Sequence, residues 1–520
     1  MPPNANTGHP RRWAILGVLV ISLLVVVLDN TILNVALRTL ADPVHGLGAS
    51  HGELEWFINS YTLVFAGLLF TFGVLGDRAG RRRMMLIGLV LFGLASLLSA
   101  YAQNPAQLIA ARALMGAGGA AIMPATLSII SNVFDPRERG RAIGIWAGAV
   151  GLAMAIGPIL GGLLLEHFWW GSVFLINVPV VALGVVLVAL LVPESRDPNP
   201  GRIDVLGVAL SVVGLVTLTY GIIDGGEHGF DRPLVWAAIV GGLAVLAWFI
   251  AHERRSSHPS LDVRLFREPR FAVPVALIGL VFFAAMGVMF FSSFYLQLVR
   301  GYSPLQTGLI FLPFAVAQLF FAPRSAAMVR RYGPRAVAVV GLVLSAVALG
   351  AFALIDAVTP IWVVLVFFFI QGAGMANIMP PATESIMSAL PREKAGVGSA
   401  VSNTIRQVAA ALGVAVLGSV LAAGYRNGID PALTELPPQA REAAGESISG
   451  AYAAAGQLGP TAPQLITAAN DAFISAMHWS AALAALVTAA GILVALRWMP
   501  TRSGTGAPAA VGEPELAGTA

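Results

Sequence analysis

The chain has 520 residues, of which 57% are hydrophobic and only 11% are charged. A soluble domain carries about 25% charged residues, so the composition excludes a soluble protein and indicates an integral membrane protein. The absence of cysteine excludes disulfides and thiolate metal sites, and the net charge of +4 does not indicate nucleic-acid binding, because the basic residues lie beside apolar segments.

Apolar segments long enough to cross a bilayer recur along the whole chain, and fourteen of them can be counted. They cover residues 13–37, 54–76, 84–103, 106–132, 141–165, 171–193, 204–223, 234–251, 271–298, 304–323, 336–356, 361–388, 398–423 and 473–498. A membrane-spanning helix needs about 20 apolar residues. We therefore expect an all-α membrane protein with fourteen transmembrane helices.

The first segment contains a polar stretch, in which Asp29, Asn30 and Asn34 lie on one helix face. A carboxylate in hydrocarbon is costly, so an intramembrane Asp commonly faces a cavity and marks an ion or substrate path. We predict that Asp29 carries protons and that Asn30 and Asn34 line a substrate pocket. The alternative is a structural Asp29 that a neighbouring helix satisfies. Asp29 is the only carboxylate that we expect deep within the first half of the chain.

A glycine-rich basic turn, GVLGDRAGRRR, follows the second segment. Its glycines permit close helix approach and left-handed backbone, and its single Asp can meet the positive end of a facing helix. We predict a cytoplasmic latch; the alternative is that the arginines only fix the membrane orientation. The latch residues are Gly73, Gly76, Asp77, Arg78, Gly80 and Arg81.

Arg112 lies in the fourth segment, about 9 Å from the outer end of that helix at 1.5 Å per residue. Asp29 lies at a comparable depth, and an intramembrane guanidinium needs a partner. We predict that Arg112 and Asp29 act together in proton coupling, with a static structural pair as the alternative.

Small residues recur on one face of the fifth segment at spacings of four and three. They are Gly144, Gly148, Gly151, Ala155, Pro158 and Gly162. Such a stripe permits close helix packing, and a proline inside a helix weakens the hydrogen-bond ladder. Packing alone explains the stripe, and the pairs Gly157-Pro158 and Gly161-Gly162 stand out within it.

The second half supplies candidate pocket residues. The segment 271–298 is rich in phenylalanine and methionine, which suit a broad pocket for lipophilic cations, although lipid-facing packing explains most of them equally well. The candidates are Phe290, Phe294, Gln318, Gln371 and Asn377. Glu384 and Arg406 lie on consecutive segments at similar depth, and we predict that they form a gating pair.

Lysine and arginine alternate from one loop to the next. The loops on one predicted side of the membrane together hold 24 Lys and Arg residues, and the loops on the other side hold five. Arg112 and Arg406 lie inside apolar segments. By the positive-inside rule, both termini are cytoplasmic.

The chain also repeats itself. MGAGGAAIMPATLSII from Met115 matches QGAGMANIMPPATESIM from Gln371, and RAGRRRMMLIGLVL from Arg78 matches RYGPRAVAVVGLVL from Arg331, both at an offset of about 253–256 residues. The repeat predicts two parallel halves of six helices each, with an inserted pair of helices between them. In proteins of this architecture, substrate binds between the halves. We expect a cytoplasmic tail at 1–12, a first half at 13–193, an inserted pair at 194–270, a second half at 271–499 with an extracellular loop at 424–472, and a tail at 500–520.

Five motifs in order resemble those of a known family. They are LDNTILNVAL from Leu28, GVLGDRAGRRRMM from Gly73, RALMGAGGA from Arg112, GPILGG from Gly157 and FWWGSVFLINVP from Phe168. The chain resembles the 14-helix drug/proton antiporters of the major facilitator superfamily, in the branch that exports quaternary ammonium compounds and methyl viologen. The resemblance implies that Arg112 belongs to a proton-coupling motif, although Met115 replaces a common glutamine. It also implies that the 73–83 turn latches the outward-facing state and that GPILGG is an antiporter motif.

These observations favour a proton-coupled exporter of lipophilic cationic or amphiphilic compounds, with a proton-coupled lipid or metabolite transporter as the alternative. The partners are then small lipophilic molecules, protons and the lipid bilayer, in a monomer of the plasma membrane. We expect no enzyme, cofactor, metal or nucleic acid. The eight histidines fall near loops or segment ends, and the only lysine, Lys394, follows Glu393 and therefore cannot complete a P-loop.

Overall fold

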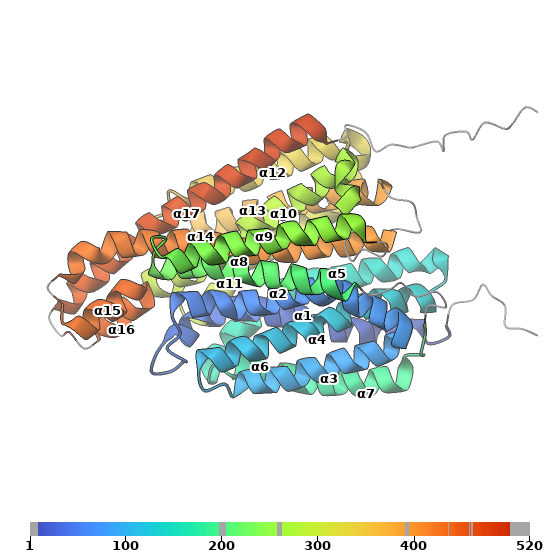
Figure 1. Ribbon diagram of the computed structural model, residues 1–520, viewed down its shortest axis with the longest axis horizontal. Helices are drawn as coiled ribbons and strands as arrows, with labels where there is room; N and C mark the ends of the chain where they lie inside the picture. The colour runs from blue at the N-terminus through green and yellow to red at the C-terminus, as the bar shows by residue number, and fades with distance from the viewer. Residues whose placement is uncertain are drawn as a thin grey trace, which may run out of the picture.

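The computed structural model describes residues 9–196, 204–256, 263–389, 395–434, 436–456, 458 and 461–499, and these residues are helical without any β-strand (Figure 1). Residues 1–8 of the predicted tail 1–12, and residues 500–520, lie outside this part of the chain. The helices are α1 (Arg12–Ala41), α2 (His51–Ala79), α3 (Arg81–Ala100), α4 (Pro105–Val133), α5 (Pro136–His167), α6 (Ser172–Leu175), α7 (Asn177–Leu191), α8 (Val205–His228), α9 (Pro233–Arg255), η1 (Val263–Arg267), α10 (Pro269–Phe294), η2 (Tyr295–Val299), α11 (Pro304–Tyr332), α12 (Pro334–Phe352), α13 (Ile361–Ser388), α14 (Ala395–Leu433), α15 (Pro438–Glu446), α16 (Ile448–Ala455) and α17 (Ala462–Trp498).

Within the described ranges, twelve helices are long and apolar enough to cross a membrane. Helix α2 meets the same test only as a bent pair, His51–Leu69 and Thr71–Ala79, which meet at 51°. Helix α5 has 32 residues, and its clearly apolar part, Ile156–His167, is shorter than a membrane span. The structure thus supports a multi-pass membrane protein with about twelve spanning helices, and the predicted number of fourteen stays a prediction.

The contacts between helices follow the same plan twice. In the first set, α4 packs against α2 and α3, while α7 packs against α1 and α3, and α1 packs against α5. In the second set, α13 packs against α11 and α12, while α17 packs against α10 and α12, and α10 packs against α14. Two contacts of the same kind join the sets, α5 with α11 and α2 with α14. This pairing is what the internal sequence repeat leads one to expect.

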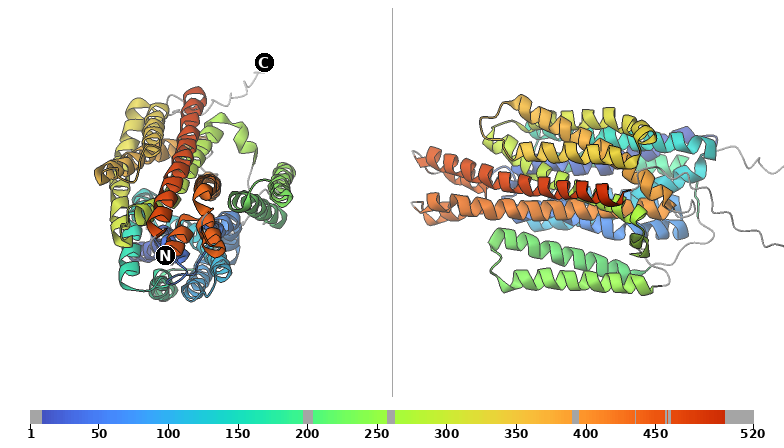
Figure 2. Two further views of the ribbon diagram at one scale, coloured as in Figure 1. Left: turned by 90° about the vertical axis from the view of Figure 1, so that its left-hand side faces the viewer. Right: turned by 90° about the horizontal axis from the view of Figure 1, so that it is seen from above.

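Helices α8 and α9 stand outside both sets. They pack against each other, and α8 also packs against α2 and α14 (Figure 2). The end-on view shows this pair at the edge of the bundle, beside the junction of the two sets. They therefore cover the α2–α14 junction on its lipid side.

The two ends of the bundle differ. The chain start lies beside the end of α4, because the His9 amide donates to the Val133 carbonyl at 2.8 Å, and Arg335 at the start of α12 donates to the Ala495 carbonyl near the end of α17 at 3.2 Å. Helices α15 and α16 lie at the opposite end (Figure 1). We call this opposite end the outer end, after the orientation that the basic residues predict.

The long segment between the last two spans differs from the prediction. Helix α14 continues ten residues beyond the predicted end at 423, to Leu433, and α17 begins at Ala462, before the predicted start at 473. The chain between them folds into α15 and α16. The Tyr425 hydroxyl donates to the Ala444 carbonyl, and the Tyr452 hydroxyl donates to the Leu298 carbonyl. The first bond holds α15 against α14, and the second holds α16 against η2, so propensity alone did not fix the helix ends.

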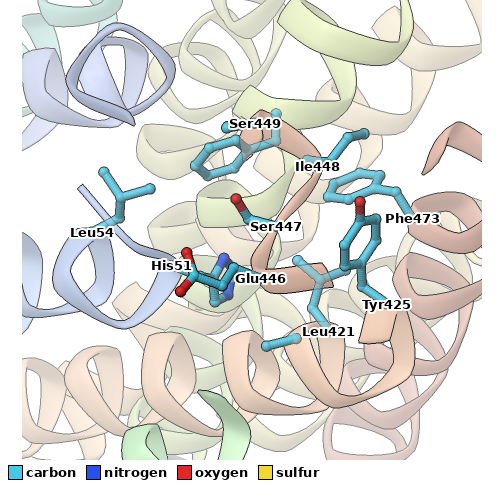
Figure 3. Close-up of a pocket in the computed structure, with 11 residues that line it drawn as sticks. His51, Leu54, Leu421, Tyr425, Glu446, Ser447, Ile448, Ser449 and Phe473 are labelled. Atoms are coloured by element: carbon cyan, nitrogen blue, oxygen red, sulfur yellow. The ribbon is translucent and has the colours of Figure 1, made fainter. Parts of the chain in front are cut away.

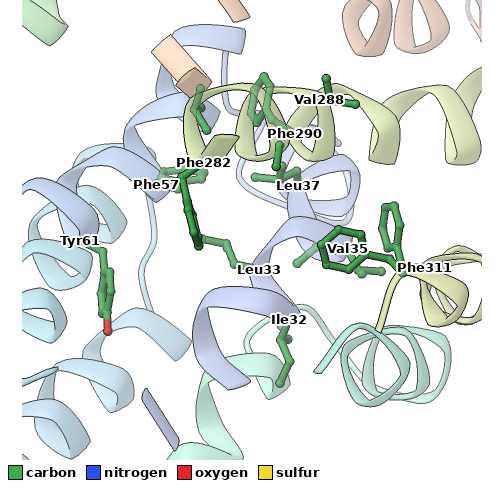
Figure 4. Close-up of a cluster of buried hydrophobic side chains, with 14 of the residues drawn as sticks. Ile32, Leu33, Val35, Leu37, Phe57, Tyr61, Phe282, Val288, Phe290 and Phe311 are labelled. Atoms are coloured by element: carbon green, nitrogen blue, oxygen red, sulfur yellow. The ribbon is translucent and has the colours of Figure 1, made fainter. Parts of the chain in front are cut away.

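The two sets meet around the outer half of α1. Figure 4 shows Val35 and Leu37 of α1 beside Phe290 of α10 and Phe311 of α11. All four side chains are buried, and the Gln297 amide donates across the junction to the Val35 carbonyl at 3.0 Å. The two sets are therefore in close contact near the outer end.

Candidate functional site

Asp29 of α1 and Arg112 of α4 form an ion pair inside the first set of helices. Arg112 Nη1 donates to Asp29 Oδ2. Asp29 is 2% exposed and Arg112 is fully buried. An isolated buried charge is strongly disfavoured, so each residue satisfies a need of the other. The structure thus brings together the two residues predicted for proton coupling.

Asn177, at the start of α7, holds the other oxygen of the same carboxylate. Its side-chain nitrogen donates to Asp29 Oδ1 at 3.0 Å and also to Ser96 Oγ of α3 at 3.1 Å. Ser96 Oγ in turn donates to the Phe174 carbonyl at 2.8 Å. Sequence reasoning assigned no role to Asn177 or Ser96. The sequence did contain one indication of this role, because Asn177 is a polar residue within the apolar motif that begins at Phe168.

Helix α2 fixes the guanidinium of Arg112 from another side. Arg112 Nε donates to the Phe57 carbonyl at 2.8 Å, and the guanidinium carbon lies 4.6 Å from the centre of the Tyr61 ring. Arg112 Nη2 is buried, and none of the described residues is its hydrogen-bond partner. A buried donor without an acceptor is destabilising, so the site has one donor free for water or a ligand.

Asn30 and Asn34 bond to their own helix. Asn30 Nδ2 donates to the Val26 carbonyl, and Asn34 Nδ2 donates to the Asn30 carbonyl, each at 3.1 Å. Both side chains are half-buried. They lie near Asp29 in sequence, but the bonds described for them go to their own helix backbone, and their oxygens can still accept from a ligand.

In the second set, Gln371 of α13 lines a small pocket between α10, α11 and α13. Its walls are apolar and include Met286, Met289, Phe314 and Phe368. Gln371 is 4% exposed, and among the described residues neither its side-chain nitrogen nor its oxygen has a hydrogen-bond partner. A free amide beside methionine and phenylalanine side chains suits contact with an amphiphilic ligand.

The other predicted pocket residues lie elsewhere. Asn377 is buried, and its nitrogen donates to the Ala373 carbonyl at 2.8 Å. Gln318 is half-buried on α11. Phe290 and Phe294 are buried near the outer end, with ring centres 5.4 and 6.4 Å from the ring of His51. These residues therefore do not form a single cluster with Gln371 in this conformation.

The first set of helices contains a second buried carboxylate, which sequence reasoning did not single out. Glu55 of α2 is 1% exposed, and His51 beside it is 9% exposed. Helix α2 begins at His51, three residues before the predicted segment, and α14 covers its first turn. A carboxylate that stands at a segment boundary in the sequence is therefore buried in the structure.

The glycine-rich turn after α2 binds within its own set of helices. Arg81 Nε donates to Asp77 Oδ1 at 2.9 Å, and the Arg82 amide donates to Glu194 Oε1 at 3.2 Å. Gly80 has φ +117°, which only glycine adopts readily, so it sets the sharp turn between α2 and α3. The interactions described for Asp77 and Arg81 thus stay within the first set in this conformation.

The GPILGG motif lies between α1 and α11. A Cβ at Gly161 would meet Ile32 of α1, and a Cβ at Gly162 would lie 2.5 Å from the Leu305 Cα of α11. A Cβ at Gly308 of α11 would likewise meet the backbone of Pro158. Small residues on both helices therefore allow the two sets to meet at the outer end.

Glu384 and Arg406 are not paired here. Among the described residues, Arg406 Nη2 donates to Asn403 Oδ1 at 2.6 Å, and the Arg406 guanidinium carbon lies 5.4 Å from the Phe282 ring centre. The Glu384 side chain is exposed. The two residues share a depth, but α10 and α14 hold the arginine on a different face.

Comparison with known proteins gives a consistent result. The model of the Major Facilitator Superfamily matches residues 19–414. The multidrug efflux pump LfrA of Mycolicibacterium smegmatis is 37% identical over 495 residues, which cover 95% of this chain and 97% of that protein. The methyl viologen resistance protein SmvA of Salmonella typhimurium is 34% identical over 489 residues, which cover 94% of this chain and 97% of that protein.

Solved structures share the fold at low sequence identity. A bacterial homologue of the human lysosomal transporter Spinster, in an inward-facing and unoccupied conformation, aligns with a TM-score of 0.68 at 16% identity and covers 96% of this chain and 99% of its own. A peptide transporter POT in complex with sulfate aligns with a TM-score of 0.61 at 16% identity, covering 94% and 96% of the two chains.

Proposed function

The chain belongs to the Major Facilitator Superfamily, and from that premise we propose that it exports lipophilic cationic or amphiphilic compounds in exchange for protons. It is a transporter and not an enzyme. Relatives named as a multidrug efflux pump and a methyl viologen resistance protein align with almost the whole chain, which supports drug export.

The buried Asp29–Arg112 pair is the observation that carries the proposal. A carboxylate held by an arginine and by Asn177 inside the bundle can exchange its negative charge for a proton or a cationic substrate. When Asp29 takes a proton, Arg112 loses its counter-charge and the pair loosens. A substrate cation that binds near Asp29 then favours release of that proton.

Alternating access follows from where the two sets of helices touch. The α5–α11 and α2–α14 contacts described above lie towards the outer end, which supports a conformation closed on that side. In the opposite conformation, we propose that Gly73, Gly76, Asp77, Arg78, Gly80 and Arg81 latch the cytoplasmic side. Their partners within the first set would then be exchanged for partners in the second set.

The substrate pocket in this proposal includes Gln371, whose amide can bond a polar group while Met286, Met289 and Phe314 contact apolar rings. Asn30, Asn34, Phe290, Phe294, Gln318 and Asn377 are proposed to contribute at other stages of the cycle. Methionine and aromatic walls adapt to ligands of different shape.

The organisation proposed for the membrane is six, two and six helices, with the halves at 13–193 and 271–499 and with 194–270 between them. Counting α2 as one bent span and α5 over its 32 residues supports fourteen spans. Both termini are then cytoplasmic, and the 424–472 loop is extracellular. We propose that the unit is a monomer in the cell membrane.

Export of ethidium from proteoliposomes under an imposed pH gradient tests this function. We expect ethidium to accumulate on the side of the vesicle membrane that the outer end of the protein faces. This accumulation should disappear when a protonophore removes the pH gradient. Exchange of lipids or anionic metabolites in the same vesicles, without movement of any cationic dye, would instead support the lipid or metabolite transporter.

A further inference from the structure

A histidine–glutamate pair ties the first turn of α2 to α14 at the outer end. His51 Nε2 lies 3.3 Å from Glu55 Oε1 and 3.2 Å from the Gly418 carbonyl oxygen of α14. The same imidazole N–H therefore faces a carboxylate on its own helix and a carbonyl of the opposite set. This contact crosses the junction that must open for release to the outside.

The packing around the pair leaves little free space. Gly418 has no side chain, and a Cβ there would overlap the Glu55 carboxylate, so a larger residue cannot keep this approach. Phe290 and Phe294 of α10 cover the imidazole ring from the other side. The pair is thus clamped between α10 and α14, away from bulk water.

One oxygen of the carboxylate is not satisfied. Glu55 Oε2 is buried and has no hydrogen-bond partner within the part of the chain that the structure describes. Burial of an ionised oxygen without a donor is unfavourable, while the protonated carboxyl is neutral and is buried at lower cost. The geometry therefore offers a place for one proton.

Charged groups of two other helices lie near the pair. Glu227 of α8 accepts from the Gly52 amide at 3.3 Å, and Arg426 of α14 is committed to the carbonyls of Gly226 and Glu227. The residues of α10 that touch the imidazole are the two phenylalanines. No positive side chain from α8, α10 or α14 is described in contact with Glu55.

Helix α15 adds an acid at the mouth. Glu446 and His51 line the same small pocket, which is partly open to solvent (Figure 3). Burial raises the pKa of Glu446, and the negative charges of Glu227 and Glu442 add to this rise. An acid of this kind beside His51 can pass a proton from the outer solution to the pair.

We propose that Glu55 is a second proton-carrying carboxylate, loaded from the outer side, and that its protonation releases α2 from α14. The step adds one proton to the Glu55 carboxylate, so the His51 Nε2 loses the negative charge that faces it within α2. The carboxylate then no longer holds the imidazole in the orientation that contacts the Gly418 carbonyl of α14, the contact across the junction weakens, and the outer end opens. This inference rests on the proposed proton exchange and extends it to two protons per cycle, one at Asp29 and one at Glu55.

Two protons fit the export of dications. A rigid dication such as methyl viologen can leave in exchange for both protons without net charge movement, whereas a monovalent cation needs only one. Loss of Glu55 is then expected to impair dication export more than export of ethidium.

The first test counts protons. The ratio of protons to methyl viologen is measured from reversal of flux in proteoliposomes for the parent chain, Glu55→Gln and Glu166→Gln, which changes an exposed carboxylate at the outer end of α5. The expected ratio is two for the parent and for Glu166→Gln, and one for Glu55→Gln. An equal ratio in all three proteins would overturn the proposal.

The second test follows the outer end without substrate. Because the chain has no cysteine, spin labels at Val44→Cys and Val358→Cys, which are 80% and 83% exposed, report the distance across the outer mouth. In the parent, we expect the fraction of molecules with the longer, open label-to-label distance to rise as pH falls. In Glu55→Gln, we expect this fraction to be the same at every pH. A parental pH response in Glu55→Gln overturns the proposal even if no compound is transported.

Gly418→Ala separates gating from proton binding and also covers the case in which Glu55→Gln does not fold. It keeps the Glu55 carboxylate and pushes α14 away. The expected ratio stays at two, while the closed distance is depopulated at every pH. A Gly418→Ala protein that closes as the parent does would show that the pair does not hold the outer end.

Discussion

Asp29 and Arg112 each carry a charge that the membrane core does not tolerate alone. Their equal depth in the sequence was enough to predict that they meet, because each has few alternatives among apolar neighbours. Asn177 could not be predicted as the third member. Its position beside Asp29 and Ser96 depends on the packing of α7 against α1 and α3, which brings together segments far apart in the sequence.

Asp29→Asn should abolish efflux driven by a pH gradient, because the amide cannot carry the proton. It should also lower stability by about 3–5 kcal/mol, since Arg112 is left as an uncompensated buried charge. The double variant Asp29→Asn with Arg112→Gln should recover most of that stability but no transport. Thermal unfolding followed by tryptophan fluorescence gives the first quantity, and dye efflux gives the second.

Asp430→Asn, which changes an exposed carboxylate on α14, is the control for these variants. It should retain both stability and efflux. Active efflux by Asp29→Asn under the same gradient would assign the ion pair to structure alone.

Helix α5 acts as a spacer between α1 and α11. Its glycines were recognisable in the sequence as a packing stripe, but the sequence did not say which helices they approach. The structure assigns Gly161 to α1 and Gly162 to α11 of the other set. A helix of the first half is thereby shaped to fit the second half at the outer end, where the halves must separate and rejoin in each cycle.

Gly162→Val should prevent close approach of α5 and α11, because the new side chain would collide with the backbone at Pro304 and Leu305. Overpacking of this kind destabilises a structure by about 1–3 kcal/mol. We expect it to destabilise the conformation that is closed at the outer end. The Val44→Cys and Val358→Cys spin-label pair should then report a shift to the open distance, together with loss of efflux.

Gly17→Val is the matched control, because a Cβ at Gly17 meets nothing within 4 Å. It should keep the parental distance distribution. An unchanged distance distribution in Gly162→Val would mean that the close α5–α11 contact does not stabilise the conformation closed at the outer end.

At the scale of the whole chain, the internal repeat predicted the architecture most securely. Matching segments at Met115 and Gln371 correspond to α4 and α13, which hold equivalent places in the two sets. The sequence could not give the extension of α14 and α17 beyond the predicted segments or the burial of Glu55. The extension depends on contacts with α15 and α16, and the burial depends on the packing of α14 against α2. Contacts between distant segments leave no periodic pattern in the sequence.

Reporter fusions test the orientation and the number of spans. Green fluorescent protein after Ala520 should fluoresce, and alkaline phosphatase at the same place should be inactive, because the positive-inside rule puts this end in the cytoplasm. Phosphatase inserted at Gly229, between α8 and α9, should be active if this pair crosses the membrane. Inactive phosphatase at Gly229 would reduce the proposed fourteen spans to twelve.

Because α8 and α9 shield the α2–α14 seam, the bilayer reaches this nearly symmetric bundle unevenly. Among the described residues, no further helix packs over the twin seam between α5 and α11, and large apolar side chains there face outward, including Leu163, Leu309 and Val316. We therefore expect a compound dissolved in the bilayer to meet the bundle at the α5–α11 flank more often than at the α2–α14 flank.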